Sequence, residues 1–339
     1  MPMMRAAVVS VFGNDPVVQL VTKPVPGPGQ LLVQVEACGL CHTDLHAAAG
    51  DWPVKPQLPF IPGHEAIGVV AELGEGVTGH KVGDRVGVAW LHSACGACEY
   101  CVGGWETLCM SQKNTGYGVP GGLAEYMLAD AKFAARLPEG SAIDLASVLC
   151  AGVTTYTGLL EADVRPGQWV AVLGIGGLGH MAVQYAKAMG LHVVAVDIDV
   201  GKLALARSLG ADAAFDAGAS GTIAEIVALT GGGVHGALVT AVSTVSFAQA
   251  VAMVRRKGTV SLVGLPPGDF PMPIFEVVLK RITIRGSIVG TRNDLAEALA
   301  FAGEGQVKAI VESRPLADVA AAFADLRAGR VNGRLVLVP

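Results

Sequence analysis

The sequence predicts an α/β fold in which a doubly wound parallel sheet is joined to a second, mostly β domain. The chain has 339 residues, more than a single hydrophobic core usually serves, so two domains are expected. From about Gly152 onward, apolar runs of strand length alternate with longer helical patterns, which is typical of a parallel doubly wound sheet. We therefore expect a mostly β domain made of residues 1–151 and 290–339, and a doubly wound domain made of residues 152–289.

The composition favours a well-buried core and a small-molecule partner. Hydrophobic residues make up 52% of the chain and charged residues 16%, a balance that excludes wholesale disorder. The net charge is −5, and no block of lysine or arginine is present to hold a nucleic acid backbone or an acidic membrane. We expect no nucleic acid and no membrane partner.

Cysteine usage and the N-terminus indicate a cytoplasmic protein. Residues 1–10 lack the features of a signal peptide, and no apolar run is long enough to span a bilayer. The seven cysteines are an odd number, and four of them are crowded into residues 95–109, which is poor geometry for a disulfide framework. Metal binding in a reducing compartment fits this pattern better.

The individual elements follow from local patterns. Before Gly152, short alternating runs lie between turn signals at residues 24–29, 59–63 and 74–76, so this part is predicted to be mostly β. Strands are then predicted at 169–173, 192–197, 236–240, 258–263 and 282–287, with helices that include 179–189 and 200–209. A helical stretch after Gly290 and a strand at 333–338 are expected to fold back onto the N-terminal part.

A glycine-rich turn predicts a dinucleotide site of the Rossmann type. The strand at 169–173 runs directly into GIGGLG, residues 174–179, and then into a helical pattern. Gly174, Gly176 and Gly179 occupy the GxGxxG positions, with Gly177 between them. The first glycine allows a tight turn, the second lets the backbone approach a pyrophosphate, and the third allows close packing of helix and strand. A structural strand-to-helix turn without a ligand is the alternative.

An acidic residue favours NAD over NADP. Asp197 ends the next predicted strand, near the separation at which a carboxylate meets the adenosine ribose hydroxyls. A carboxylate there would repel a 2′-phosphate, and Lys202 is placed to hydrogen-bond the ribose beside it.

Four closely spaced cysteines predict a structural zinc site. Cys95, Cys98, Cys101 and Cys109 form the pattern CxxCxxCx7C within one glycine-bearing loop. Four thiolates can surround a tetrahedral zinc and leave no open position. An iron–sulfur cluster or a chance group of free thiols remains the alternative.

A second, dispersed set could hold a catalytic metal. Cys41, His64 and Cys150 are individually unremarkable, because a buried cysteine is usually a small apolar residue. Together they offer two thiolates and one imidazole, a set that leaves zinc a fourth position for water or substrate.

With these motifs, the sequence resembles the zinc-containing medium-chain dehydrogenase/reductase superfamily over its whole length. GHEAIGVV, residues 63–70, is similar to the zinc motif of that family. The stretches CHTDLHAAAGDWPVKPQLPFIPGHE and CGACEYCVGGWETLC resemble bacterial propanol-preferring and yeast-type alcohol dehydrogenases especially closely. The resemblance implies a Rossmann domain and a GroES-like catalytic domain.

The resemblance also implies roles for residues around the metal. Cys41, His64 and Cys150 would bind the catalytic zinc, with Glu65 as an alternative ligand. Asp44 would hold a ligand imidazole, and Thr43 and His46 match the proton relay of the family, which runs through the cofactor ribose.

Four further positions match the pocket and the cofactor site of the family. Trp52 and Trp90 would line the substrate pocket and narrow it toward short alcohols, with core aromatic residues as the alternative. Thr154 would lie beside the nicotinamide, and Arg334 would contact the pyrophosphate unless it is an ordinary surface charge.

The activity implied is reversible hydride transfer between short primary alcohols or aldehydes and NAD, with one catalytic and one structural zinc per subunit. The short stretch between Cys109 and Cys150 resembles the microbial branch, whose members are tetramers. A polyol dehydrogenase, which commonly has glutamate where Cys150 stands, a zinc-free quinone reductase and a non-catalytic NAD-binding protein remain the alternatives.

Overall fold

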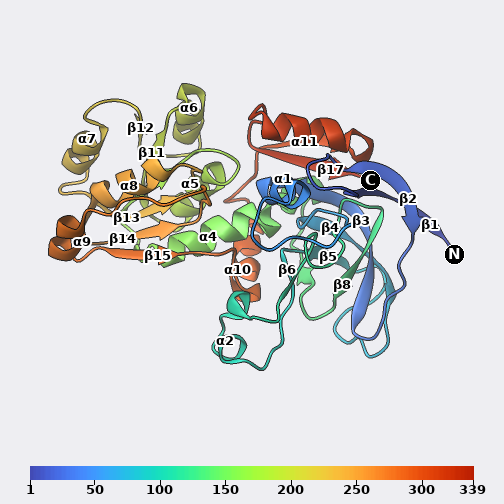
Figure 1. Ribbon diagram of the computed structural model, residues 1–339. Coiled ribbons are helices and arrows are strands. Elements are labelled where there is room, and N and C mark those ends of the chain that lie inside the picture. Colours follow the sequence, from blue (N-terminus) through green and yellow to red (C-terminus); the bar gives the residue numbers. More distant parts are fainter. The chain divides into compact units, whose positions relative to one another are not determined.

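The computed structural model describes all 339 residues, Met1–Pro339, and the chain divides into two compact units. Unit 1 comprises Met1–Cys150, Thr291–Gly303 and Ala309–Pro339, and unit 2 comprises Ala151–Gly290 and Glu304–Lys308. Each unit has its own sheet (Figure 1). The grouping of Glu304–Lys308 with unit 2 is a detail that the sequence pattern does not predict.

The sheet of unit 1 has seven strands, in the order β16-β17-β3-β4-β5-β9, with β8 also paired to β3. Their bounds are β3 Gln30–Leu40, β4 Ala66–Leu73, β5 Arg85–Val88, β8 Tyr126–Asp130, β9 Ala135–Arg136, β16 Val311–Pro315 and β17 Arg334–Val338. Pairing is antiparallel except between β16 and β17. Leu335 of β17 pairs with Leu40 of β3, so the end of the chain completes the sheet begun by its N-terminal part.

Smaller elements surround this sheet. Two strand pairs are β1 Met3–Val8 with β2 Val17–Thr22, and β6 Leu91–Ser93 with β7 Lys113–Asn114. The helices of unit 1 are α1 His42–Ala49, α2 Glu99–Val102, α3 Ala142–Ala146, α10 Arg292–Gly303 and α11 Val319–Arg327, with 3-10 turns η1 Glu106–Leu108, η2 Ser147–Leu149 and η3 Leu316–Asp318. Helix α11 lies along β17 and buries Phe323 in the core (Figure 1).

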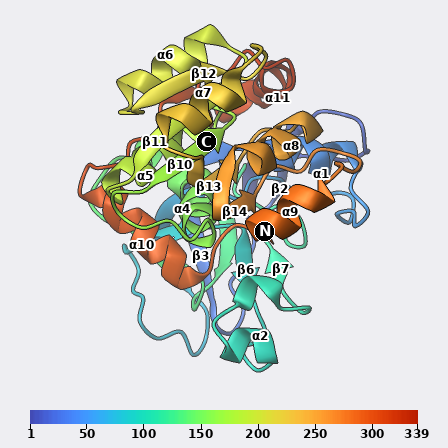
Figure 2. The same ribbon diagram turned by 90° about the vertical axis from the view of Figure 1, so that its left-hand side faces the viewer.

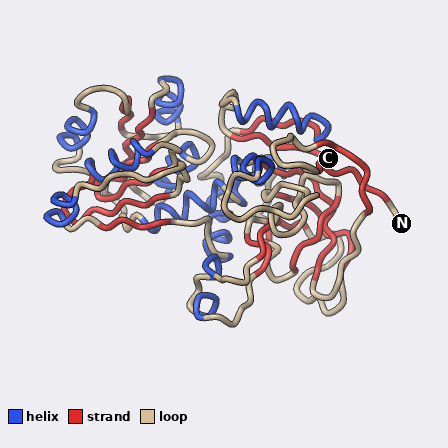
Figure 3. The backbone as a smooth tube through the Cα atoms, in the orientation of Figure 1, coloured by secondary structure: helices blue, strands red, loops and turns tan.

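Unit 2 contains a parallel six-stranded sheet in the order β12-β11-β10-β13-β14-β15. Figures 2 and 3 show strands of this sheet with helices around them. Its strands are β10 Trp169–Leu173, β11 His192–Asp197, β12 Ala213–Asp216, β13 Val234–Val239, β14 Val254–Leu262 and β15 Thr283–Gly286. Its helices are α4 Ala151–Glu161, α5 Gly179–Ala188, α6 Val200–Ser208, α7 Thr222–Leu229, α8 Thr244–Met253 and α9 Ile274–Lys280.

The strand order makes this sheet doubly wound. The chain moves outward from β10 to β12 and then returns to β13 on the other side of β10, so right-handed crossovers place α5 and α6 on one face and α7 and α8 on the other. The contacts agree, because α5 packs on α4 and α6 while α7 packs on α8. The predicted fold class, a Rossmann sheet together with a mostly β domain, is confirmed.

No single helix is long and apolar enough to cross a membrane, although the bent pair Ala142–Leu149 and Ala151–Glu161 passes that test when counted together.

Candidate functional site

The glycine-rich turn of unit 2 lies between β10 and α5, and its glycines meet three different surroundings. Gly174 has a φ of +92°, and a Cβ there would lie 2.7 Å from the backbone N of Ala241. A Cβ on Gly179 would lie 1.8 Å from the carbonyl oxygen of Gly174, so helix and strand can approach this closely only at glycine. A Cβ on Gly176 would meet no atom within 4 Å. The turn therefore needs Gly174 and Gly179 for its own packing, whereas Gly176 leaves open space for a ligand.

Asp197 holds this turn from the end of β11. Its side chain is buried, and the backbone N of Ile175 donates to its Oδ2 at 2.6 Å. The backbone N of Asp199 donates to Oδ1 at 3.0 Å, and Asp199 in turn accepts from the backbone N of Lys202 as the N-cap of α6. No side chain caps the N-terminus of α5, so its positive dipole end is left for an anion. Thr154 is buried in α4.

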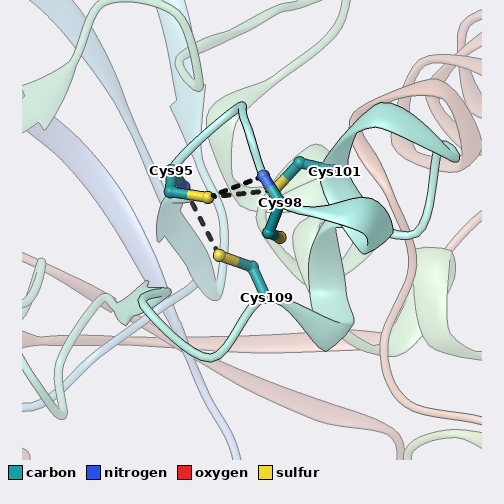
Figure 4. A group of neighbouring side chains, drawn as sticks. All are labelled: Cys95, Cys98, Cys101 and Cys109. Atoms are coloured by element: carbon teal, nitrogen blue, oxygen red, sulfur yellow. Dashed lines mark hydrogen bonds between the residues drawn. The ribbon is translucent and has the colours of Figure 1, made fainter.

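The four closely spaced cysteines converge in unit 1, and Figure 4 shows their side chains turned toward one another. The Sγ atoms of Cys95, Cys98, Cys101 and Cys109 all lie within 4.8 Å of one another. Backbone N–H groups of Ala97 and Cys98 donate to the Sγ of Cys95 at 3.4 and 3.3 Å, and the N–H of Cys95 donates to the Sγ of Cys109 at 3.4 Å. The amide of Ala97 is the largest cause that lowers the pKa of Cys95, to about 6. These donors favour a thiolate at Cys95, and four cysteine sulfurs with no fifth ligand fit a closed zinc site.

The dispersed set also converges in unit 1. Four buried residues each contribute one ligand atom, and these four atoms lie within 4.8 Å of one another. The residues are Cys41, His64, Glu65 and Cys150. Cys41 precedes α1, His64 and Glu65 precede β4, and Cys150 follows η2. The structure therefore brings together residues that are more than a hundred positions apart in the sequence.

Asp44 fixes this cluster from α1. Its Oδ1 lies 3.2 Å from the Nδ1 of His64 and accepts from the backbone N of Gly63 at 2.9 Å, while its Oδ2 accepts from the backbone N of Cys41 at 2.9 Å. The imidazole is therefore held with Nδ1 toward Asp44. The Nε2 atom is buried without a hydrogen-bond partner and faces the two sulfurs, which is the arrangement expected of a metal ligand.

Burial and close contact shift the pKa values of the clustered side chains in different directions. The pKa of Cys41 is held well below its ordinary value, first by the hydrogen bond from the Cys150 thiol and then by His64. Burial is the largest cause that raises the pKa of Glu65, to about 7, although Arg334 opposes it. Arg334 begins β17, is almost fully buried, and donates to the Oε1 of Glu65. That ion pair was not predicted, and it leaves the Nε of Arg334 without a partner.

Aromatic rings connect the cluster with helix α1. Trp90 packs edge-on against His64 with ring centres 5.2 Å apart, and His46 stacks on Trp52 at 5.1 Å. Tyr117 contacts both indoles, at 5.7 Å from Trp90 and 6.0 Å from Trp52, and its hydroxyl donates to the carbonyl of Val54. Tyr117 was missed by the sequence analysis, because nothing near it marks a loop tyrosine as the link between two distant tryptophans.

Thr43 and His46 lie one turn apart on α1. Thr43 is half-buried, and the Nδ1 of His46 lies 3.0 Å from the Oδ2 of Asp51. Asp51 was also missed, although an acidic residue directly after the C-cap glycine of α1, Gly50, is a signal that could have identified it.

Comparison with known proteins agrees with this fold. Residues 27–139 match the family described as the alcohol dehydrogenase GroES-like domain, and residues 177–304 match the zinc-binding dehydrogenase family. An alcohol dehydrogenase of Rhizobium meliloti (strain 1021) is 60% identical over 335 residues, which cover 98% of this chain and 98% of that protein.

Two solved structures are similar over the full chain. The alcohol dehydrogenase of the hyperthermophilic archaeon Aeropyrum pernix has a TM-score of 0.90 and 32% identity, and the match covers 99% of this chain and 100% of that one. A zinc-binding dehydrogenase from Sinorhizobium meliloti 1021, solved with NADP, has a TM-score of 0.92 and 28% identity, with 100% of both chains covered. The chain belongs to the zinc-dependent medium-chain dehydrogenase/reductase superfamily and, within it, to the alcohol dehydrogenases.

Proposed function

We propose that this protein catalyses reversible hydride transfer between short primary alcohols or aldehydes and NAD. The observation that carries the proposal is the buried convergence of Cys41, His64 and Cys150, with the Nε2 of His64 left without a protein partner. These three residues would hold a catalytic zinc, and Glu65 would serve as an alternative ligand. When bound there, zinc supplies a Lewis acid that favours loss of the hydroxyl proton of the substrate at neutral pH.

The residues of α1 would position the metal ligands and move the proton. Asp44 keeps the imidazole of His64 oriented through its Nδ1. Thr43 would accept the proton from the substrate hydroxyl, and His46 would receive it and release it to solvent, with the ribose of a bound cofactor lying between the two residues. The half-exposed side chain of His46 gives that proton a route to solvent.

The rings of Trp52, Trp90 and Tyr117 would form the wall of the substrate pocket. The rings of Trp90 and His64 are in T-shaped contact, so bulk at position 90 limits the space next to the metal ligand. A wall built from two indoles and a phenol favours short unbranched alcohols over long or branched ones.

The cofactor proposed is NAD. Gly174, Gly176, Gly177 and Gly179 would receive the pyrophosphate, and Asp197 with Lys202 would hydrogen-bond the adenosine ribose. Each carboxylate oxygen of Asp197 accepts one hydrogen bond, from Ile175 or Asp199, and can accept another from the ribose. The negative charge of Asp197 disfavours a 2′-phosphate. Thr154 would lie beside the nicotinamide, and Arg334, whose Nε has no partner in the protein, would contact the pyrophosphate.

A second zinc is proposed at Cys95, Cys98, Cys101 and Cys109, where it would have a structural role.

We further propose a cytoplasmic homotetramer without nucleic acid or membrane partners. The seven free cysteines support a reducing compartment. Exposed apolar side chains in and beside α9, together with the edge strand β15, support association of copies of the chain; they are Met272, Ile274, Phe275, Val278, Leu279 and Ile288.

The proposal is tested by the rate of NAD reduction with 1-propanol, measured before and after a chelator removes metal. We expect activity that the chelator abolishes and added zinc restores. A protein that binds NAD but never turns over 1-propanol would contradict the proposal. Sorbitol in place of 1-propanol separates the polyol alternative, NADP in place of NAD tests the assignment of Asp197, and light scattering gives the number of subunits.

A further inference from the structure

The loop that carries the four cysteines is tied to helix α10 by a carboxylate and a guanidinium that are 186 positions apart in the chain. Glu106 lies in η1, between Cys101 and Cys109. The backbone N of Cys109 donates to the carbonyl oxygen of Glu106 at 3.1 Å, so any shift of Glu106 moves this ligand. Glu106 is buried with only 8% of its surface exposed, which is unusual for a carboxylate unless it has a partner.

Arg292 is that partner, and its backbone N and all three guanidinium nitrogens donate hydrogen bonds. Its backbone N donates to the Oε1 of Glu106 at 2.9 Å, its Nε donates at 2.9 Å, and its Nη2 donates to Oε2 at 2.7 Å. Its Nη1 donates to the carbonyl of Lys132 at 3.0 Å, and the guanidinium lies 4.3 Å from the ring centre of Phe133. A planar fork held at both ends fixes the carboxylate in one orientation.

The charge of Arg292 also acts on the cysteine site. The hydrogen bond to Glu106 is the largest cause that raises the pKa of Arg292, and the negative charge of a thiolate at Cys101 acts in the same direction. Four thiolates around a divalent cation leave an excess of negative charge, so a nearby guanidinium stabilises the loaded site. The side chain of Arg292 is 48% exposed, which screens this attraction and makes the fixed geometry the larger effect.

We propose that Arg292 is a positioning residue for the four-cysteine metal site: through Glu106 it holds the segment that carries Cys109, and it thereby sets how firmly the site keeps its metal. The inference rests on the structural zinc proposed above. Partners of this kind behind the ligands of a metal typically change metal affinity 10- to 100-fold when they are altered. The alternative is a purely structural clamp on α10, whose loss would lower stability without a selective effect on the cysteines.

The test compares zinc-loaded wild type with R292Q, and reads each site separately. Excess chelator and iodoacetamide are added to each protein. Mass spectrometry then measures the rate at which Cys95, Cys98, Cys101 and Cys109 are alkylated, and compares it with the rate at Cys41 and Cys150. We expect R292Q to expose the four cysteines about 10- to 100-fold faster while Cys41 and Cys150 keep the wild-type rate. E106Q, which keeps the shape of the side chain without its charge, should change the same cysteines in the same direction.

Arg314 provides the matched control, because it bridges Glu312 and Asp325 in unit 1 without contact to a cysteine. In R314Q, the cysteines of both sites should be alkylated at the wild-type rates. If R292Q does not fold, R292K takes its place; it retains the charge but loses the fork, and a smaller selective increase is expected. Unchanged rates, or equal increases at both sites, would overturn the proposal. Absence of zinc from the four cysteines of wild type would refute the metal site itself, and that result is separate because it is measured before any variant.

Discussion

The two cysteine clusters of unit 1 would hold the same metal, yet they are built in opposite ways. Cys95, Cys98, Cys101 and Cys109 come from one short loop, and the first of them is exposed. Cys41, His64 and Cys150 come from three separate segments and are all buried. The cluster from one loop has four sulfurs, which would leave no coordination position open. The cluster from three segments has two sulfurs, an imidazole and a nearby carboxylate. If the proposed roles hold, ligand number and burial, more than metal identity, separate a zinc site that stabilises the chain from a zinc site that binds a substrate.

The same division appears in unit 2 within a single turn. Gly174 and Gly179 are required by neighbouring backbone atoms, while Gly176 borders open space. The first two would serve the fold and the third would serve the ligand. Variants in the two clusters and in this turn should therefore separate loss of function from loss of stability.

The largest effect is expected from C150S. Loss of one sulfur from a site with only three protein ligands should lower kcat/KM for 1-propanol by about 1000-fold, since the Lewis acid supplies several kcal/mol of charge stabilisation. Titration with NAD should show unchanged binding. C38S is the matched control, because Cys38 is a buried thiol that donates to the carbonyl of Gly39 and lies outside both clusters. Retained activity in C150S would mean that the catalytic ligand set is wrong.

C98S should affect stability more than turnover. The free energy of metal binding at a closed site is also free energy of folding, so the variant should unfold about 5–10 °C lower in scanning calorimetry. At 25 °C its kcat/KM should stay close to that of wild type. If C98S lost activity as C150S does while keeping its thermal stability, the roles of the two clusters would be reversed.

The four-cysteine cluster could be predicted from the sequence alone, whereas the cluster of Cys41, His64 and Cys150 could not. Four cysteines within one loop are close whatever the rest of the fold does, so their spacing alone indicates a site. Cys41, His64 and Cys150 meet only because β3, β4 and η2 bring their segments together, and the sequence supplied this set through resemblance to a family. Contacts such as Arg334 with Glu65, separated by 269 positions, have no local signal at all.

The fold shows the same limit. The strands at β10 and β11 were predicted from apolar runs with the bounds that the structure has, Trp169–Leu173 and His192–Asp197. Strand β12, Ala213–Asp216, was missed because it is short, lies at the sheet edge, and has only one buried residue, Ala214. Its pairing with β11 depends on the neighbouring strand and leaves little trace in its own sequence.

D44N should weaken the catalytic site selectively. An amide can accept from the backbone N of Cys41 or Gly63, but without the charge it holds the Nδ1 of His64 less firmly. We expect the affinity for the catalytic zinc to fall about 10- to 100-fold, measured by competition with a chromophoric chelator. Excess zinc should restore most of the turnover. Zinc at the four cysteines should be retained, and its loss in D44N would show that Asp44 supports unit 1 as a whole.

The smallest effect is expected from G176A. The added Cβ meets no protein atom within 4 Å, so thermal unfolding should match that of wild type, but the methyl group would stand between the turn and the pyrophosphate. Weakening of one hydrogen bond of about 1.4 kcal/mol raises the Kd for NAD about tenfold. G179A is the contrasting variant, because its Cβ would clash with the carbonyl oxygen of Gly174 and should destabilise unit 2 by about 1–3 kcal/mol. If G176A unfolded as early as G179A, or bound NAD as tightly as wild type, Gly176 would belong with the glycines that serve the fold, and the division proposed for this turn would fail.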